Sequence, residues 1–199
     1  MSGITWDERY AEAGYAYGTK PNEFLVEVRK DIPPGRILCL CEGEGRNAVY
    51  LAEQGYTVTA VDASVVGMAK AQKLAAERGV KIETIVSDLE EYAIEKDSFN
   101  GVVSIFCHVP KELRVKIHQQ VCQGLKQDGV LVLEAYFPKQ LEFATGGPPT
   151  AELMMDLQSL KGELAGLELL RAEEKTREII EGKYHTGQGA VVQVLAKKL

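Results

Sequence analysis

Hydrophobic and polar positions along the chain form two kinds of pattern. Short runs that are almost wholly apolar are typical of strands buried on both faces of a sheet. Between these runs, apolar residues recur at three- and four-residue spacing, which predicts helices with one buried face. The apolar runs predict strands over residues 36–41, 56–64, 81–89, 100–106, 129–137, 167–180 and 189–199.

The expected helices carry start and stop signals. Asn22 is placed to cap a first helix over 23–32, which Pro33 and Pro34 would end. Ser64 can cap a third helix in the same way, and Pro110 opens a fourth. The remaining helices are predicted from the three- and four-residue spacing of their apolar residues. The helices expected after the first are 46–54, 65–79, the stretch after Pro110, and 150–164.

Strands and helices alternate until the last two strands, which follow one another without a helix between them. Two such strands must pair antiparallel, because a parallel connection needs a crossover. We therefore expect an α/β fold, a Rossmann-like doubly wound, mostly parallel seven-stranded sheet with a C-terminal antiparallel hairpin. No repeat or linker interrupts the pattern, so residues 1–199 are expected to form a single domain.

Composition narrows the choice of partners. The 199 residues are 45% hydrophobic and carry a net charge of −6, which suits a globular core and lacks the basic surface that nucleic acid requires. The opening residues, MSGITWDERYAEA, contain no apolar signal segment, and no apolar run is long enough to span a bilayer. We expect a cytoplasmic protein with no nucleic-acid and no membrane partner.

The four cysteines, Cys39, Cys41, Cys107 and Cys122, lie in apolar segments and show no metal-ligand spacing. Cys39 and Cys41 alternate with leucines on one predicted strand, which would place both thiols on the same face. Buried, reduced thiols are expected, and no metal site is expected.

A glycine-rich loop carries the chemistry. GEGRNA at 43–48 follows a strand and opens a helix, which matches the G-x-G-x-x-A loop of dinucleotide sites, and Asp62 ends the next strand where a carboxylate can bind ribose hydroxyls. Glu42 and Glu44, however, lie beside the loop. A carboxylate about 4–5 Å from a phosphate costs on the order of several kcal/mol at an effective dielectric constant near 20.

The two acids therefore favour a cofactor that is positively charged near the loop. S-adenosylmethionine fits this condition, since it carries a sulfonium and an ammonium group and has no phosphate. Glu44 could instead face solvent and favour the helix dipole, and Glu42 could contact the loop itself. Asp88, at the exit of the third strand, could accept from an adenine amine or could be a turn residue.

At this point the chain resembles a class I S-adenosylmethionine-dependent methyltransferase, from about residue 36 to its end. The resemblance lies in ILCLCEGEGRNAVYLAEQGYTVTAVDAS, VSDLEEY, SIFCHVP and LKQDGVLVLEAYF. Within that class, GEGRNAVYLAEQGY…VDAS, WDERYAEAGYAYGTKPNEFL and TGGPP are most similar to the small-molecule branch around tellurite-resistance-like methyltransferases.

The resemblance implies roles for individual positions. Gly43 and Gly45 would line the methionine part, Asp62 would bind the ribose, and Asp88 with Leu89 would contact the adenine. The full set of candidate cofactor-binding residues is Glu42, Gly43, Glu44, Gly45, Asn47, Asp62, Ala63, Asp88, Leu89, Ile105 and Phe106. The chain departs from the family pattern at Cys39 and Cys41, which stand where an aspartate and a glycine are usual, and Glu42 is expected to replace that aspartate.

The same resemblance implies a separate role for each of three segments of the chain. Residues 1–35 would form an N-terminal lid and helix, 36–137 the cofactor-binding core, and 138–199 the acceptor-side loop, helix and hairpin.

Methyl transfer from a sulfonium needs alignment in a dry pocket, and it needs a general base only when the acceptor loses a proton. We assign no catalytic residue. Tyr17, His108 and His185 are candidates for contact with the acceptor. His108 could instead be a capping histidine, and His185, in the predicted hairpin loop, is better explained as an exposed surface residue. His118 is expected to be solvated.

The function expected from this sequence is methyl transfer to a small molecule or small oxyanion by a monomer or weak homodimer. Two alternatives remain open. One is an NAD-type Rossmann oxidoreductase, which the acidic loop disfavours. The other is a cofactor-binding protein without catalytic activity, which the departures at Cys39 and Cys41 leave open.

Overall fold

The computed structural model describes residues 6–199. The first five residues lie outside the described residues. Two predictions therefore begin outside the described residues. One is the N-terminal lid and helix over 1–35, and the other is the lack of an apolar signal segment in MSGITWDERYAEA.

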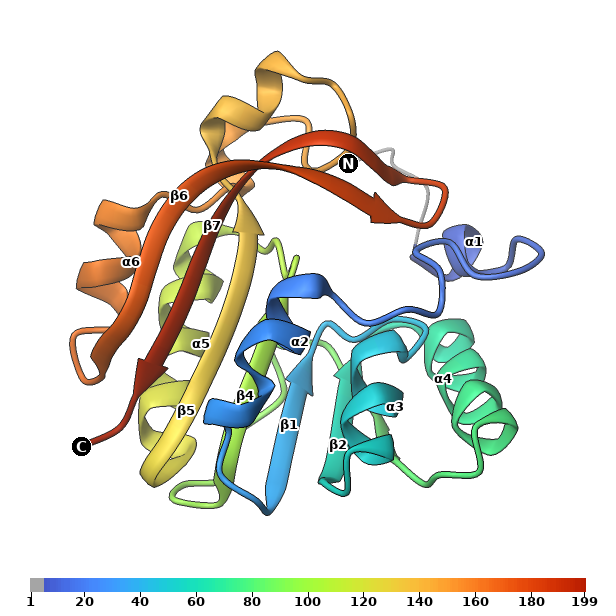
Figure 1. Cartoon of the computed structure of the whole chain (residues 1–199), viewed down its shortest axis with the longest axis horizontal. Helices are drawn as coiled ribbons and strands as arrows, with labels where there is room; N and C mark the ends of the chain where they lie inside the picture. The colour runs from blue at the N-terminus through green and yellow to red at the C-terminus, as the bar shows by residue number, and fades with distance from the viewer. Residues whose placement is uncertain (1–5) are drawn as a thin grey trace.

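One seven-stranded sheet runs through the molecule in the order β3-β2-β1-β4-β5-β7-β6 (Figure 1). The first five strands pair in parallel, and β7 pairs antiparallel with both β5 and β6. The predicted fold class is therefore confirmed. The strands are β1 (Arg36–Leu40), β2 (Thr57–Asp62), β3 (Glu83–Val86), β4 (Phe99–Ile105), β5 (Leu125–Tyr136), β6 (Glu168–Glu181) and β7 (His185–Lys197).

The strand order reverses between β1 and β4. From β1 the chain moves outward to β2 and β3, and it then returns to the other side of β1 to form β4 and β5. In open α/β sheets the connections diverge at such a reversal, which leaves a crevice at the carboxyl ends of the strands. The fold thus provides a place for a ligand beside the ends of β1 and β4.

Helices cover both faces of the sheet, and β1 shows why its sequence is continuously apolar. Ile37 and Cys39 pack into one core, while Leu38 and Leu40 pack into the other. Because alternate residues from Ile37 onward face two separate cores, only the first residue of the strand, Arg36, is polar. The first core lies under α2 (Glu23–Val28), α3 (Arg46–Glu53) and α4 (Val65–Glu77), and the second under α5 (Lys111–Gly124) and α6 (Leu157–Glu163).

Two predicted helix caps are confirmed. Asn22 accepts a hydrogen bond from the Leu25 amide at the start of α2, and Ser64 accepts one from the Gly67 amide at the start of α4. The first helix is shorter than predicted, since a 3₁₀ turn, η1 (Arg29–Asp31), replaces its last part.

The helix predicted over 150–164 was wrong in extent. A 3₁₀ turn, η3 (Ala151–Leu153), comes first, Met154 and Met155 are buried in extended chain, and α6 begins only at Leu157. The side chain of Asp156 accepts from the Ser159 amide and so starts a new helix inside the predicted one. Two further elements were not predicted, the short α1 (Trp6–Tyr10) and the 3₁₀ turn η2 (Pro138–Glu142).

The terminal hairpin has a tighter turn than the sequence suggested. Glu181 of β6 pairs with His185 of β7, so the turn consists of residues 182–184 alone. Gly182 takes a φ of +70° there, and the strand resumes at His185. His185 is therefore a strand residue rather than a loop residue.

The expectation that Cys39 and Cys41 share one face was wrong. β1 ends at Leu40, and Cys41 takes a φ of +50°, outside the strand conformation. This turn carries the Cys41 side chain to the core that Leu38 and Leu40 form, opposite to Cys39.

Within residues 6–199, every helix is too short or too polar to cross a membrane.

Candidate functional site

A cavity of about 530 Å³ lies at the carboxyl ends of the parallel strands. Its walls come from the tips of β1, β2 and β4, the N-terminal segment, the loop after β5 and the tip of the β6–β7 hairpin, which meet at the same end of the sheet (Figure 1). All predicted site residues except Gly43 and Gly45 line it, namely Tyr17, Glu42, Glu44, Asn47, Asp62, Ala63, Asp88, Leu89, Ile105, Phe106, His108 and His185.

Gly43 and Gly45 act through close packing instead. A Cβ on Gly45 would lie 2.6 Å from the Cβ of Ala71 in α4, and one on Gly43 would lie 2.5 Å from the Tyr10 hydroxyl. Both glycines also have positive φ, which other residues rarely adopt. The two glycines thus let α4 and Tyr10 approach the loop.

Glu42 caps helix α3 from within the loop. Its Oε1 accepts hydrogen bonds from the amides of Asn47 at 2.8 Å and Ala48 at 2.7 Å. Burial raises the pKa of Glu42 to about 7, although the hydrogen bond from Ala48 and the nearby Arg46 act to lower it. Of the two positions considered for Glu42, contact with the loop is therefore present, and the residue also lines the cavity.

Glu44 does not face solvent, so that alternative was wrong. The side chain is 5% exposed, and it accepts from the Ala16 amide at 2.7 Å and from Lys70 Nζ at 2.9 Å. Lys70 also donates to the carbonyls of Glu12 and Gly14. Glu44 and Lys70 together tie the N-terminal segment to the rim of the cavity.

Asp62 is buried at the tip of β2. Its Oδ2 accepts from the Gly43 amide at 2.9 Å and its Oδ1 from the Ser64 amide at 2.8 Å. Burial raises the pKa of Asp62, while these two hydrogen bonds oppose the rise. Because each carboxylate oxygen can accept two hydrogen bonds, both oxygens retain an acceptor site for ligand hydroxyls.

Asp88 is exposed and belongs to a turn, since its Oδ1 accepts from the Glu90 amide at 2.8 Å. It also lines the cavity next to the buried Leu89. The turn role and a ligand role are compatible, because only one carboxylate oxygen is used in the turn.

Aromatic rings form the opposite end of the cavity. The ring centroid of His185 lies 4.5 Å from that of Tyr17 and 4.7 Å from that of Phe106. Tyr136 completes the cluster, with its ring 4.7 Å from Phe106 and 5.3 Å from His185. Sequence reasoning missed Tyr136, because its place at the end of an apolar strand does not distinguish it from a core residue.

His108 holds two backbone groups. Its Nε2 accepts from the Tyr136 amide at 3.2 Å, so its Nδ1 carries the proton and donates to the Leu153 carbonyl at 3.0 Å. Burial lowers the pKa of His108 to about 4. With both nitrogens occupied, His108 fixes the loop after β5 against the sheet, in line with the alternative of a capping histidine.

Two predictions of exposed histidines were wrong. His185 is buried, because the hairpin register places it in β7 with its side chain turned inward. His118 is buried too, and its Nδ1 lies 2.6 Å from Oε2 of Glu163. The polar neighbours of His118 in the sequence concealed this, since α6 covers that face of α5 and brings Glu163 with it.

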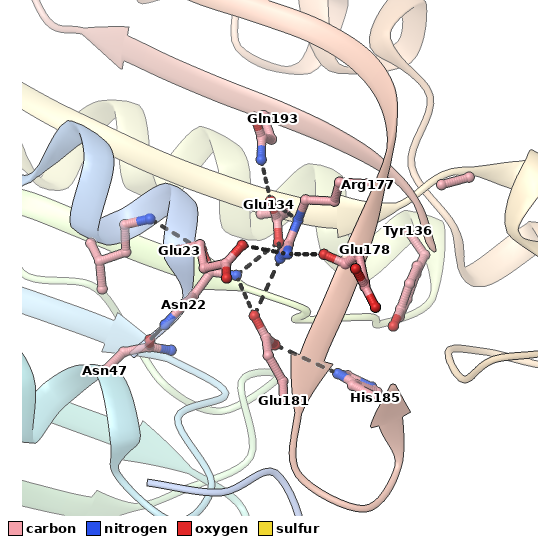
Figure 2. A network of polar contacts seen from close by, with 12 residues as sticks. Asn22, Glu23, Asn47, Glu134, Tyr136, Arg177, Glu178, Glu181, His185 and Gln193 are labelled. Atoms are coloured by element: carbon pink, nitrogen blue, oxygen red, sulfur yellow. Dashed lines mark hydrogen bonds and ion pairs between the residues drawn. The ribbon is translucent and has the colours of Figure 1, made fainter. Parts of the chain in front are cut away.

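Behind the aromatic end lies a buried network of charges that the sequence pattern did not reveal (Figure 2). Glu181 accepts from Arg46 at 2.6 Å and from Arg177 at 3.2 Å, and Glu134 accepts from Arg177 at 2.5 Å. Asn22 donates to both carboxylates. Burial raises the pKa of Glu181, but Arg46, His185 and Arg177 outweigh it and lower the pKa to about 2.

Cys41 stands where the family pattern has a glycine, and its φ of +50° is in the region that glycine favours. Its Sγ accepts from the Sγ of Cys107 at 2.8 Å. The neighbouring Cys107 thiol and burial raise the pKa of Cys41 well above its usual value. All four cysteines are free thiols, although Cys41 and Cys122 are only partly buried.

Comparisons with known proteins give a consistent answer. Residues 37–129 match the family described as "Methyltransferase domain". The glycine/sarcosine N-methyltransferase of Aphanothece halophytica is 28% identical over 134 residues, which cover 65% of this chain and 50% of that protein. The 2-heptyl-1-hydroxyquinolin-4(1H)-one methyltransferase of Mycobacteroides abscessus is 28% identical over 149 residues, 71% of this chain and 64% of that protein.

The fold is also that of a solved structure, TehB from Haemophilus influenzae. The two share 21% sequence identity and a TM-score of 0.75, over 89% of this chain and 62% of TehB. The chain thus spans between half and two thirds of the length of the two curated relatives. Taken with the strand order and the cavity at the carboxyl ends of the strands, these matches show that residues 37–129 are similar to a methyltransferase domain and that the chain has the fold of the class I S-adenosylmethionine-dependent methyltransferases.

Proposed function

We propose that this protein transfers a methyl group from S-adenosylmethionine to a small molecule. The observation that carries the proposal is the charge of the cavity. Four carboxyl groups line it, those of Glu42, Glu44, Asp62 and Asp88, together with two arginines, Arg9 and Arg46. Arg46 is paired with Glu181, and Glu44 is paired with Lys70, so acidic groups still outnumber basic ones along the walls. A pyrophosphate would be repelled there, whereas a cationic cofactor would be attracted.

The residues at the acidic end fit S-adenosylmethionine, the cofactor of this family. The two free acceptor sites of Asp62 suit the ribose hydroxyls, and the unused oxygen of Asp88 with the apolar Leu89 suits the adenine. Glu42 is placed beside the glycine loop for the positively charged methionine part. When bound, the cofactor supplies a methyl carbon activated by its positively charged sulfur.

Glu42 is also our candidate to replace the aspartate missing at Cys39. Support comes from its position, because it reaches the cavity from the loop that follows β1. Ile105 and Phe106, at the tip of β4, would border the cofactor between the acidic and the aromatic ends. The protein itself has to align the acceptor and exclude water, which the enclosing N-terminal segment and hairpin favour.

The proposal includes the division of the chain. Residues 1–35 would serve as lid and helix, 36–137 as the cofactor core and 138–199 as the acceptor side. The bond from the Ala16 amide to Glu44 supports the first role, because it holds the N-terminal segment across the acidic end. His185 at the aromatic end supports the last, because it belongs to residues 138–199 and lines the cavity together with Tyr17 and His108 from the other two parts.

The acceptor would be a small molecule or a small oxyanion. The two curated relatives are named for glycine or sarcosine and for a hydroxyquinolone, which are all small. Location in the cytoplasm, the lack of nucleic-acid and membrane partners, and a monomer or weak homodimer stay parts of the proposal. The net charge of −6 supports the lack of a nucleic-acid partner, and the four free thiols support a cytoplasmic location.

Calorimetric titration with S-adenosylhomocysteine and S-adenosylmethionine, with NAD as the control, tests the proposal. We expect binding of both adenosyl ligands in the micromolar range and no heat with NAD. Binding of NAD alone would refute the proposal, because it would place a pyrophosphate among the four carboxylates.

A further inference from the structure

Among residues 6–199, two groups of the aromatic end have a buried polar atom without a hydrogen-bond partner, His185 and Tyr136, and of the two only His185 lines the cavity. The residue is 9% exposed and lines the cavity, yet its buried Nδ1 has no hydrogen-bond partner among residues 6–199. A buried polar atom without a partner costs stability and calls for an explanation, and a catalytic role of the ring is one. His108 differs, because both of its nitrogens hold backbone groups.

Glu181 faces His185 across the turn of the hairpin. Its Oε2 lies 3.9 Å from Nδ1 of His185, an ion-pair distance that is too long for a hydrogen bond (Figure 2). Arg46, Arg177 and Asn22 hold this carboxylate in place. Hydrogen bonds of catalytic groups are often long before the ligand binds and shorten in the complex. Because Nδ1 faces Glu181, Nε2 is the nitrogen left for a ligand.

Burial of His185 favours the neutral imidazole, which is the form able to accept a proton. Burial lowers the pKa of His185, and Arg46 and Arg9 lower it further, while Glu181 acts to raise it. The other titratable groups around it are Tyr17, Tyr136 and His108, whose rings pack against the same cluster. The charges of Glu134 and Glu181 are already balanced by those of Arg46 and Arg177.

The walls around His185 indicate the shape of the acceptor. The rings of Tyr17 and Phe106 lie within 5 Å of the imidazole, and Leu153 and Pro149 line the same cavity. Aromatic and apolar walls favour a planar, apolar molecule, since an aromatic ligand can stack on such rings or meet their edges.

We propose that His185, oriented by Glu181, is the general base of this enzyme and that its acceptor is a phenol or an aromatic thiol. This inference rests on the proposed function, and it decides between a protic small molecule and an oxyanion. The acceptor oxygen or sulfur forms a bond to the methyl carbon while the bond between methyl and cofactor sulfur breaks, its electron pair staying on that sulfur. The acceptor proton moves to Nε2, and the carboxylate of Glu181, 3.9 Å from Nδ1, stabilises the resulting imidazolium.

The first test does not depend on turnover. Imidazole ¹⁵N spectra at neutral pH report which nitrogen carries the proton, and His185→Gln identifies the signal. We expect His185 to be neutral, with the proton on Nδ1 toward Glu181 and none on Nε2. His108 serves as the internal reference, because its hydrogen bonds require the same tautomer. A proton on Nε2 of His185, or an imidazolium, would overturn the proposal.

The second test uses 4-nitrophenol, whose phenol and phenolate forms absorb at different wavelengths. In the complex with S-adenosylhomocysteine, the pKa of the bound probe should fall by about one unit, because its proton moves to an imidazole paired with Glu181. Both His185→Gln and Glu181→Gln should remove the shift, and either variant decides if the other fails to fold. Glu173→Gln, on the same strand and outside the cavity, should keep it.

The outcomes separate this inference from the proposed function. Absence of S-adenosylhomocysteine binding in the wild type refutes the proposed function. The ¹⁵N spectra do not depend on that binding, so they still report which nitrogen of His185 carries the proton. Binding of the cofactor product with an unshifted probe refutes the inference alone. Methylation of tellurite or of a tertiary amine, without methylation of any phenol or thiol, would overturn it as well.

Discussion

The amide of Ala48 donates a hydrogen bond of 2.7 Å to Oε1 of Glu42, so that an acidic residue of the glycine loop caps helix α3. The arrangement satisfies an amide at the helix start that would otherwise be unpaired. It also buries the carboxyl group, and burial is the main reason why its pKa rises to about 7. One side chain thus supports the fold of the loop and places a titratable group at the cavity.

Glu42→Gln should make the protein less sensitive to alkaline pH. A carboxyl group whose pKa is raised on folding contributes stability that is present below about pH 4.5 and lost as the pH rises through 7. The amide can still accept from Asn47 and Ala48 but does not ionise. Urea unfolding measures the free energy of unfolding of the variant and of the wild type at pH 5 and at pH 8.5. The difference between variant and wild type should shift in favour of the variant by about 1–3 kcal/mol from pH 5 to pH 8.5.

The matched control for this measurement is Glu53→Gln, which changes an exposed acid of the same helix. It should leave the pH dependence as in the wild type. Identical pH dependence of the Glu42→Gln variant and the wild type would show that Glu42 is ionised at neutral pH in the folded state.

Ligand binding should release protons if Glu42 meets the positively charged part of the cofactor. A nearby cation lowers the pKa of a carboxyl group, and Glu42, with a pKa of about 7, is partly protonated at neutral pH. Calorimetry of S-adenosylhomocysteine binding at pH 7 in phosphate and in Tris should differ, with up to roughly half a proton released per ligand. Equal heats in the two buffers, or tighter binding by Glu42→Gln, would contradict a charge interaction with the ligand.

Asp62→Ala should weaken cofactor binding by about 1–3 kcal/mol, because charge-assisted hydrogen bonds to the ligand hydroxyls are lost. The variant also frees the amides of Gly43 and Ser64, so some loss of stability is expected as well. Asp156→Ala is the matched control, since Asp156 likewise accepts two hydrogen bonds at a helix start but is not part of the cavity lining. Equal dissociation constants for Asp62→Ala and the control would remove Asp62 from the site.

The fold followed from the sequence because its strands are buried on both faces and its helices carry caps. The apolar run at Ile37–Leu40 is explained only by a strand that is buried on both faces, and Asn22 and Ser64 cap helices where predicted. The acidic end of the cavity could be predicted for a related reason, as the tips of parallel strands must meet at one edge of the sheet.

The aromatic end could not be predicted in the same way. The burial of His185 depends on a three-residue turn, and a hairpin register is set by tertiary pairing that the local sequence left open. The network around Glu134 and Arg177 joins residues more than 40 positions apart. Polar residues in a strand or loop look solvated until the segment that covers them is known, and this explains the error at His118 as well.

The stability of the protein should fall between pH 6.5 and pH 4 through His108. The folded-state pKa of His108 is lowered to about 4, so its contribution is complete above the unfolded value of 6.5 and is lost as the pH falls toward 4. The loss amounts to about 2–3 kcal/mol at the acid end. His108→Gln should flatten this part of the stability profile, and an NMR titration of the wild-type His108 ring with a midpoint near 6.5 would contradict the prediction.

Glu134→Gln should cost about 3–5 kcal/mol of stability, because it leaves Arg177 with one buried counter-charge fewer. Glu134 is fully buried and accepts from Arg177, Asn22 and Gln193. Equilibrium urea unfolding measures the loss, and Lys73→Ala, which breaks an exposed pair with Glu77, should leave the midpoint unchanged.

A double variant distinguishes charge balance from packing in this network. Glu134→Gln combined with Arg177→Met removes both charges, so it should recover much of the stability that Glu134→Gln alone loses. Additive losses would instead mean that the side chains matter for their shape. Because Arg177 is one of three residues that hold Glu181, the double variant should loosen that carboxylate and change its contact with His185, while Arg46 and Asn22 still bind it. Recovered stability together with a changed ¹⁵N signal of His185 would then show that the network orients the histidine beyond supporting the fold.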